Sequence, residues 1–275
     1  FRVMTSHDLL SHDAFLTSTE RMPLLFIGHG NPMNAVEDNA FHRTWQELGR
    51  TLPRPKAILS ISAHWITTDA TLITAMPHPK TIHDFGGFPR ILFEQHYPAP
   101  GSPRLAEETK HVVKHPTVEL DHSWGLDHGT WSVVKPMYPE ANIPVLQLSI
   151  DYGKPMRFHY EIGKQLKALR ERGVMIIGSG NIVHNQQRIK FEGGDPYDWA
   201  IEFDSKIGDA LVRKDDQAIL DFQKLGPLAK LAHPTYDHFL PLLYTLGAVD
   251  KQDSMSFFTN SFDLASVSMR SVLYR

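Results

Sequence analysis

The sequence predicts an α/β protein with three layers, in which helices cover both faces of a mostly parallel central sheet. Short apolar runs with the length of buried strands alternate along the chain with segments expected to be helical. These runs are apolar at nearly every position, as in strands that are covered on both faces. The last twenty or so residues instead contain two alternating runs, which predict a C-terminal antiparallel strand pair on the sheet.

The first half of the chain supplies the strands nearest the expected core. Strands are predicted at residues 24–27, 57–65, 71–75 and 117–120. Helices are predicted at residues 34–52 and 103–114, the second with Ser102 as N-cap and Pro103 in its first turn. A right-handed crossover between the first two strands would bring their carboxyl ends to the same edge of the sheet.

The second half repeats the alternation. Strands are predicted at residues 143–150 and 174–177, and the closing pair at residues 255–262 and 265–274. Helices are predicted at residues 155–172, 198–213 and 239–246, with shorter helical segments up to residue 231. Gly173 and Gly247 are expected to end helices, and Asp198 to cap one.

Composition excludes several classes of function. The net charge of −3 and the scattered basic residues give no face for a nucleic acid. No apolar run reaches the ~18 residues of a membrane span, and the first residues lack the layout of a signal peptide, so a cytoplasmic protein is expected. Residues 1–21 are expected to be an N-terminal extension or an added end, and residues 22–275 one catalytic domain.

Histidines are the side chains that indicate chemistry. Cysteine is absent, so a metal would have to be held by nitrogen and oxygen, and 16 histidines are available. The candidates stand beside glycine or at the end of an element: His29, His64, His128, His184 and His238. Each could equally be a hydrogen-bonded histidine in a turn. Most other histidines, among them His159, are expected at the surface, and His233 in a polar loop.

Familiar local motifs are missing. The sequence has no His-Glu-x-x-His, no Gly-x-Ser-x-Gly, no phosphate-binding loop and no Gly-x-Gly-x-x-Gly that opens a helix. Aromatic residues do gather in sequence near the candidate histidines, which suits an aromatic substrate, although core packing is the commoner role of such residues. They include Trp65, Phe85, Phe88, Trp124 and Trp131.

Six blocks in this order resemble the class III extradiol ring-cleaving dioxygenases, in particular the 4,5-DOPA dioxygenase-like branch. The blocks are Gly28-His29-Gly30-Asn31-Pro32, Ser62-Ala63-His64-Trp65, residues 82–89, Gly125-Leu126-Asp127-His128-Gly129, residues 178–185 and residues 238–242. The resemblance runs from about residue 22 to the C-terminus. It implies an α/β/α core with a non-haem iron site, and some bacterial members are found with zinc.

The resemblance also implies roles for individual histidines. His29 and His64 are similar to metal ligands, and His238 to a third ligand. His184 is similar to a histidine that either binds the metal or acts as acid and base, and His128 to one that faces substrate and oxygen. Better-known members complete the site with a glutamate, whereas no carboxylate stands out in this sequence. An all-histidine, neutral set of ligands favours zinc in the purified protein, although ring cleavage would need Fe(II).

The predicted function is therefore extradiol cleavage of a small aromatic diol, such as 4,5-DOPA, by dioxygen. Histidine suits the proton transfers because its pKa lies in the working range. Two alternatives stay open at this point. A zinc hydrolase would use a metal-bound water, and a non-catalytic binding protein would have kept the fold without turnover.

Overall fold

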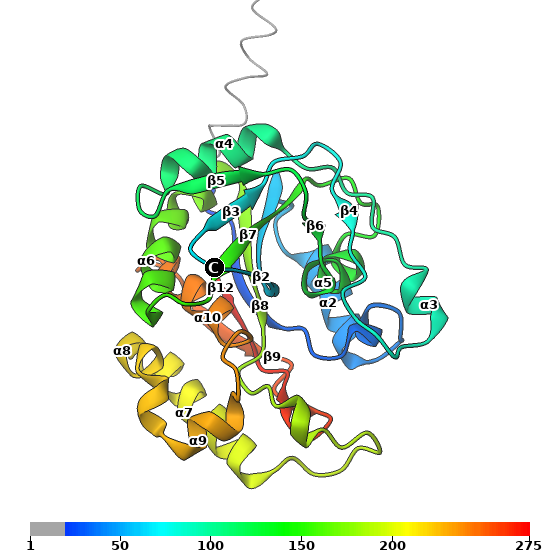
Figure 1. The fold of residues 1–275 in the computed structure, drawn as a ribbon, viewed down its shortest axis with the longest axis vertical. Coiled ribbons are helices and arrows are strands. Elements are labelled where there is room, and N and C mark those ends of the chain that lie inside the picture. Colours follow the sequence, from blue (N-terminus) through cyan, green and yellow to red (C-terminus); the bar gives the residue numbers. More distant parts are fainter. Residues whose placement is uncertain (1–19) are drawn as a thin grey trace, which may run out of the picture.

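The computed structural model describes residues 20–275 (Figure 1). Its strands are β1 (Leu24–Gly28), β2 (Ala57–Thr67), β3 (Thr71–Thr74), β4 (Lys80–Thr81), β5 (Val118–Asp121), β6 (Gly125–Leu126), β7 (Val145–Asp151), β8 (Val174–Gly180), β9 (Met255–Phe258), β10 (Phe262–Asp263), β11 (Val267–Ser268) and β12 (Ser271–Tyr274). Its α-helices are α2 (Ala40–Thr51), α3 (Arg90–Phe93), α4 (Pro103–Val112), α5 (His128–Met137), α6 (Met156–Leu166), α7 (Asp198–Val212), α8 (Asp216–Leu220), α9 (Pro227–Ala232) and α10 (Leu240–Gly247). Short 3-10 helices are η1 (Pro32–Ala35), η2 (Lys167–Arg172), η3 (Gln186–Arg188) and η4 (Phe222–Leu225).

One sheet of eight strands carries the fold, in the order β5-β3-β7-β2-β8-β1-β12-β9. Its centre, β7-β2-β8-β1, is parallel throughout. The pairs β1-β12 and β12-β9 are antiparallel, and so is the separate pair β10-β11. The predicted mostly parallel sheet and its C-terminal antiparallel pair are confirmed.

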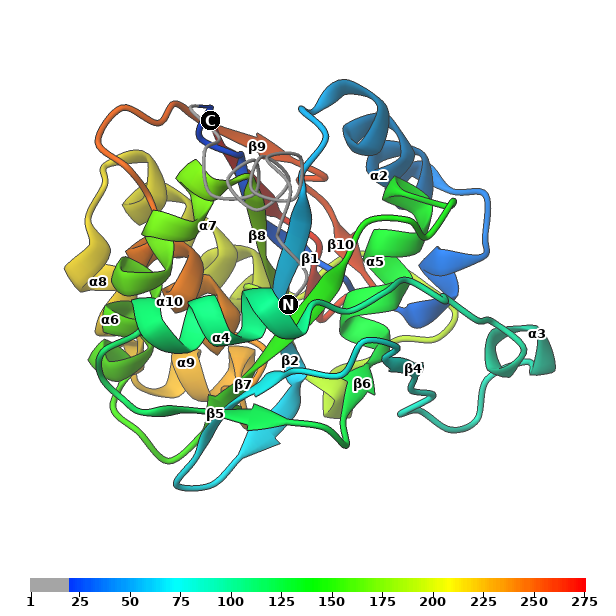
Figure 2. The same ribbon diagram turned by 90° about the horizontal axis from the view of Figure 1, so that it is seen from above.

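Helices cover both faces of this sheet, as Figures 1 and 2 show, with α4, α6 and α10 on one side and α2 and α5 on the other. The buried apolar residues form two corresponding clusters. One contains Leu105, Ile162 and Leu243, and the other contains Trp45 and Trp131. The predicted three-layer α/β/α arrangement is thus confirmed.

Several local expectations need correction. The predicted helix at residues 34–52 is two elements, η1 and α2, and Asn39 caps the second by accepting a hydrogen bond from the His42 backbone amide. Tyr197, not Asp198, occupies the N-cap of α7, and no side chain caps that helix. Gly173 does end the helical segment at a left-handed φ of 85°.

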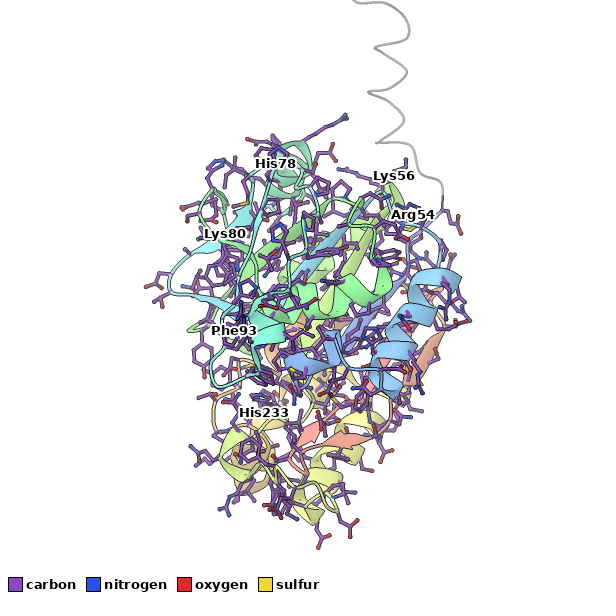
Figure 3. All side chains as sticks on the ribbon, turned by 90° about the vertical axis from the view of Figure 1, so that its right-hand side faces the viewer. Arg54, Lys56, His78, Lys80, Phe93 and His233 are labelled. Atoms are coloured by element: carbon purple, nitrogen blue, oxygen red, sulfur yellow. The ribbon has the colours of Figure 1, made fainter. Side chains whose placement is uncertain are left out.

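Two histidines expected near solvent lie in the interior instead. His159 is on α6, is fully buried, and has Nδ1 2.9 Å from the Tyr244 hydroxyl. His233, labelled in Figure 3, is buried among Phe203, Phe222 and Phe239 and donates from Nε2 to the Ile182 carbonyl at 2.7 Å. His159 shares the buried face of α6 with Ile162 and Leu166, and the loop before α10, which contains His233, also faces the core.

Most of the predicted N-terminal extension, residues 1–19, lies outside the described residues. At its end, Arg21 forms ion pairs with Asp250 and Asp253, both at 3.2 Å. Among residues 20–275, no helix combines the length and apolar character that crossing a membrane would require.

Candidate metal centre

Five segments bring the candidate histidines to one edge of the sheet. His29 directly follows β1, His184 follows β8 by four residues, and His64 lies near the end of β2. Because β1, β8 and β2 are neighbouring parallel strands, their carboxyl ends open into the same crevice. His128 begins α5, and His238 stands two residues before α10.

A break in the pairing of β2 accompanies the position of His64. Ile61 pairs with Leu148 and Ile66 with Ile150, so β2 advances five residues while β7 advances two. The extra residues form a bulge, a feature that re-aims side chains at strand ends. Within it, the His64 amide donates to Ser62 Oγ at 3.2 Å, and Ser62 donates to the buried Asp127 at 2.7 Å.

The histidine rings converge on a common space. The ring centroids of His29, His64 and His238 are 5.1, 5.2 and 4.9 Å apart in pairs, and the Nε2 atoms of His29 and His64 are 3.1 Å apart. The ring centroids of His128 and His64 are 3.9 Å apart. The ring of His184 stacks on that of His238, with 3.5 Å between the centroids and 7° between the ring planes. All five histidines line one pocket of about 440 Å³.

Two separate sets of side chains could each hold a metal ion. The ligand atoms of His29, His64 and His128 lie within 4.8 Å of one another, and so do those of His184, Asp237 and His238. The sequence therefore located the residues that converge, and the geometry leaves more than one way to divide them between a metal and a substrate.

Hydrogen bonds fix the tautomer of two rings. Ser179 donates its only hydroxyl proton to the Gly129 carbonyl at 2.5 Å, so toward His29 Nδ1, at 3.0 Å, its oxygen must accept. His29 therefore carries its proton on Nδ1 and leaves Nε2 unprotonated. His238 is held in the same way by a short contact of Nδ1 with Asp237, and its buried Nε2 has no partner among the described residues. Two inward-facing lone pairs of this kind suit a divalent cation.

Burial keeps these histidines neutral. Desolvation, followed by repulsion from neighbouring histidines, lowers the pKa of His29 and His238 well below the usual value. Desolvation also lowers the pKa of His64 to about 3 and that of His184 to about 4. A neutral imidazole is the form that binds a metal ion, so this donor set fits a non-haem metal.

The sequence analysis missed two carboxylates. Asp84 lies in the loop before α3, where its Oδ1 is 3.0 Å from His128 Nδ1 and its Oδ2 is 3.7 Å from His64 Nδ1. Burial alone would raise the pKa of Asp84, but its contacts with His128 and His64 lower it below the usual value. Asp237 is the residue before His238. Its adjacency to a candidate ligand was a signal in the sequence, whereas Asp84 is brought near only by the fold.

An aromatic wall borders the histidines. Phe85 and Phe88 line the pocket, and their rings meet edge to face at 5.6 Å. Phe85 also contacts His128, with ring centroids 5.5 Å apart. Residues 82–89, one of the six blocks of the family resemblance, thus place aromatic surface beside the imidazoles. Trp65 and Trp124 stack on each other at 5.4 Å and do not line this pocket.

Several known proteins are similar to this chain over most of its length. A 4,5-DOPA dioxygenase extradiol of Escherichia coli (strain K12) is 46% identical over 96% of this chain and 98% of its own length. A 4,5-DOPA dioxygenase extradiol of Mirabilis jalapa is 39% identical over 82% of this chain and 86% of its own. The crystal structure of an uncharacterized Escherichia coli K12 protein superposes with a TM-score of 0.81 at 43% identity, covering 92% of this chain and 99% of that one. The family described as the catalytic LigB subunit of aromatic ring-opening dioxygenase matches residues 22–272, and the chain belongs to this family.

Proposed function

We propose that this LigB-family enzyme opens the ring of a catechol by extradiol cleavage, with 4,5-DOPA as the representative substrate. The names of its relatives from Escherichia coli and Mirabilis jalapa support that substrate. The observation that carries the proposal is the convergence of five histidines, with Phe85 and Phe88 beside them, in one pocket of about 440 Å³. We take residues 22–275 as the single catalytic domain.

Enzymes of this family depend on a non-haem metal, and we assign His29, His64 and His238 to hold it. The mutual approach of their rings to about 5 Å supports this set. Fe(II), when bound there, would supply the activation of dioxygen that ring cleavage requires. An all-nitrogen site also favours zinc over Fe(II) in affinity, so we expect zinc in much of the purified protein.

His184 has two candidate roles, ligand and acid–base group. Its ring stacks face to face on that of His238, 3.5 Å away. The lone pairs of two stacked imidazoles lie in parallel planes, which makes it difficult for both to point at one ion. The stacking therefore favours a position beside the metal, from which His184 can exchange a proton with a substrate hydroxyl.

His128 is assigned to act on substrate. Asp84 contacts both the backbone amide of His128, at 2.9 Å, and its Nδ1, at 3.0 Å. This carboxylate orients the ring and would stabilise it when it holds a proton taken from a catechol hydroxyl. Phe85, in edge contact with His128, offers an apolar surface for the catechol ring.

The test is reconstitution of metal-free protein with Fe(II), followed by a panel of catechols that includes DOPA. Dioxygen uptake and the yellow semialdehyde product should appear together, and neither should appear without oxygen. Zinc-loaded protein is the matched control and should bind catechols without cleaving them. Turnover of ester or amide substrates by the zinc form, without ring cleavage by the iron form, would instead favour a hydrolase.

A further inference from the structure

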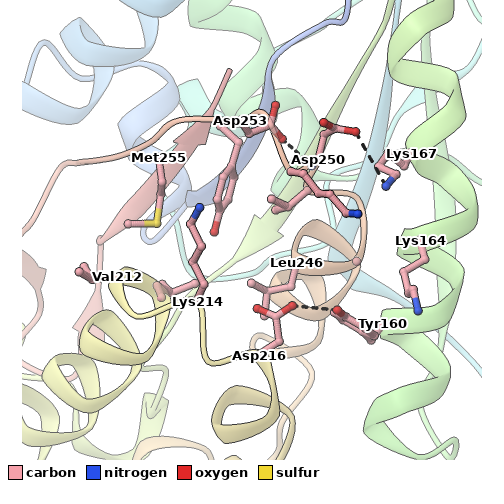
Figure 4. Close-up of a pocket in the computed structure, with 15 residues that line it drawn as sticks. Tyr160, Lys164, Lys167, Val212, Lys214, Asp216, Leu246, Asp250, Asp253 and Met255 are labelled. Atoms are coloured by element: carbon pink, nitrogen blue, oxygen red, sulfur yellow. Dashed lines mark hydrogen bonds and ion pairs between the residues drawn. The ribbon is translucent and has the colours of Figure 1, made fainter.

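A second cavity, of about 310 Å³, lies away from the metal centre and shares none of its lining residues (Figure 4). It is bounded by α6, by the ends of α7 and α10, and by the C-terminal strands β9 and β12. Its volume is at the lower end of the range for pockets that bind small molecules.

The inner wall of this cavity is apolar. Leu211 and Leu246 are buried there, and Val249 continues the wall. At the mouth, Val212 adds apolar surface, with 60% of its own surface exposed. The cavity can therefore take up an apolar group.

The acidic residues of the cavity already have partners. Asp216 accepts a hydrogen bond from Tyr160 at 2.8 Å, shown dashed in Figure 4. Asp253 forms an ion pair with the fully buried Arg170 at 2.7 Å, and Asp250 forms one with Arg21 at 3.2 Å. Asp250 and Asp253 are thus paired with arginines, whereas the partner of Asp216 is an uncharged phenol.

The basic residues are matched less completely, although Lys167 lies 3.9 Å from Asp250. Four lysines line the cavity: Lys164, Lys167, Lys214 and Lys251. Among residues 20–275, neither Lys214 nor Lys251 has a carboxylate within ion-pair distance. Lys164 is 3.5 Å from the exposed Glu161 and 5.6 Å from the centre of the Tyr160 ring. Two lysines without an acidic partner among the described residues, Lys214 and Lys251, therefore border an apolar recess.

Lys214 also adopts a backbone conformation that is costly for a lysine. It follows α7 with a positive φ of 56°, where glycine is the usual residue. Figure 4 shows its side chain extending from the end of α7 toward the strand that carries Met255. This conformation ends α7, since the Lys214 amide donates to the Leu211 carbonyl at 3.1 Å and the Asp215 amide to the Ala210 carbonyl at 2.9 Å.

We propose that this cavity binds a small organic anion with an apolar body, such as an aromatic carboxylate or sulfonate. The apolar part would occupy the recess beside Leu246, and the anionic group would meet Lys214 and Lys251 at the mouth. The site is separate from the metal centre, since α10 begins just after His238 and its last residue, Gly247, lines the cavity. Eight helical residues span about 12 Å.

The test is a fluorescence titration of the full chain with 8-anilinonaphthalene-1-sulfonate, which combines aromatic rings with a sulfonate. The double variant Lys214→Gln/Lys251→Gln should bind this probe about tenfold more weakly, because two charged hydrogen-bond donors are removed. The matched control is Lys206→Gln on the exposed face of α7, where the lysine lies 3.7 Å from Glu202, and its affinity should equal that of the wild type.

Two further arms make the outcome decisive. The uncharged analogue N-phenyl-1-naphthylamine should bind the wild type and the double variant equally, since it lacks the sulfonate. Saturation of the metal centre with 4-nitrocatechol should leave sulfonate binding unchanged. Equal affinity of the sulfonate for the wild type and the double variant, or its displacement by 4-nitrocatechol, would overturn the proposal. Both lysines are exposed, and equal thermal midpoints would confirm that the variants fold.

Discussion

The hydroxyl of Ser179 determines which nitrogen of His29 is free. Its proton goes to the Gly129 carbonyl, so its oxygen can only accept from His29 Nδ1. Replacement by alanine removes that acceptor and releases the ring to rotate or to change tautomer. Loss of such a partner behind a metal-binding histidine typically weakens metal affinity by about 10–100-fold.

Ser179→Ala should therefore bind zinc at least about tenfold more weakly in competition with a chromophoric chelator. Ser132→Ala is the matched control, since Ser132 is equally buried but its hydroxyl has no partner among the described residues. That variant should keep wild-type affinity. Equal zinc affinity in both variants would remove Ser179 from any role in orienting His29.

His128 should be required for turnover and not for metal retention. His128→Ala should keep its metal, measured by elemental analysis, and lose about 10²–10⁴-fold in the rate of catechol cleavage, as for a lost acid–base group. His83→Ala is the control, because His83 bonds to the Gln95 carbonyl at 2.7 Å and does not line the pocket. A metal-free His128→Ala protein would make it a ligand.

At the residue scale, the sequence located the histidines that follow buried strands and missed the groups that act on them. Glycines around His29 marked it as a residue displayed at a turn. Asp84 carried no such mark, because its partners His64 and His128 are 20 and 44 residues away in sequence. Conversely, His159 was wrongly assigned to the surface, although it lies three and seven residues before Ile162 and Leu166 on the buried face of α6.

At the scale of elements, strands were predicted better than helix starts. Continuous apolar runs identified β1, β2 and β8, because both faces of these strands are covered. The sequence analysis predicted no helix at α5, where His128 stands between Gly125 and Gly129. The bulge in β2 could not be predicted either, because it arises from pairing with residues of β7 that lie 84 to 87 positions later in the sequence.

The crossing of α6 and α10 depends on two glycines. A Cβ added at Gly163 would overlap the Tyr244 carbonyl oxygen, and one added at Gly247 would overlap the Tyr160 carbonyl oxygen. The helices can approach so closely only because neither position has a side chain. Backbone atoms cannot yield as the end of a flexible side chain can, so a methyl group here must push the helices apart.

Gly163→Ala should consequently lower the free energy of unfolding by about 1–3 kcal/mol, measured by urea denaturation. Gly153→Ala is the control, because a Cβ there meets nothing within 4 Å and its φ is not left-handed. Its stability should be unchanged or rise by up to about 1 kcal/mol. A Gly163→Ala protein as stable as the control would mean that α6 and α10 can separate without cost.

At the scale of the whole molecule, the layers were predictable and the strand order was not. Alternating strands and helices indicate an α/β/α architecture whatever the order of strands. Only the structure shows that β8 lies between β1 and β2, and this order is what brings His184 beside the ligands expected after the other two strands. The site thus depends on the order of the strands in the sheet, which explains why no local sequence motif predicted it.

Buried neutral histidines also make the stability of the whole protein depend on pH. Six have a lowered pKa with burial as the main cause: His29, His64, His159, His184, His233 and His238. In the unfolded chain each returns to about 6.5, so below that pH the unfolded state binds more protons than the folded state. Stability should therefore fall as the pH drops from about 6.5 toward 4.

His159 isolates one part of this effect, because it lies outside the metal centre and burial lowers its pKa to about 4. It should account for roughly 3 kcal/mol of the stability lost between pH 7 and pH 4 in metal-free protein. His159→Asn keeps a polar atom near Tyr244 but cannot gain a proton, so it should start less stable at pH 7 and lose that much less on acidification. His111→Asn, at an exposed position on α4, should follow the wild type at every pH. The test is to measure the free energy of unfolding of the three proteins by urea denaturation at a series of pH values. If this free energy changed with pH in the same way for the wild type and His159→Asn, His159 would take up a proton without unfolding.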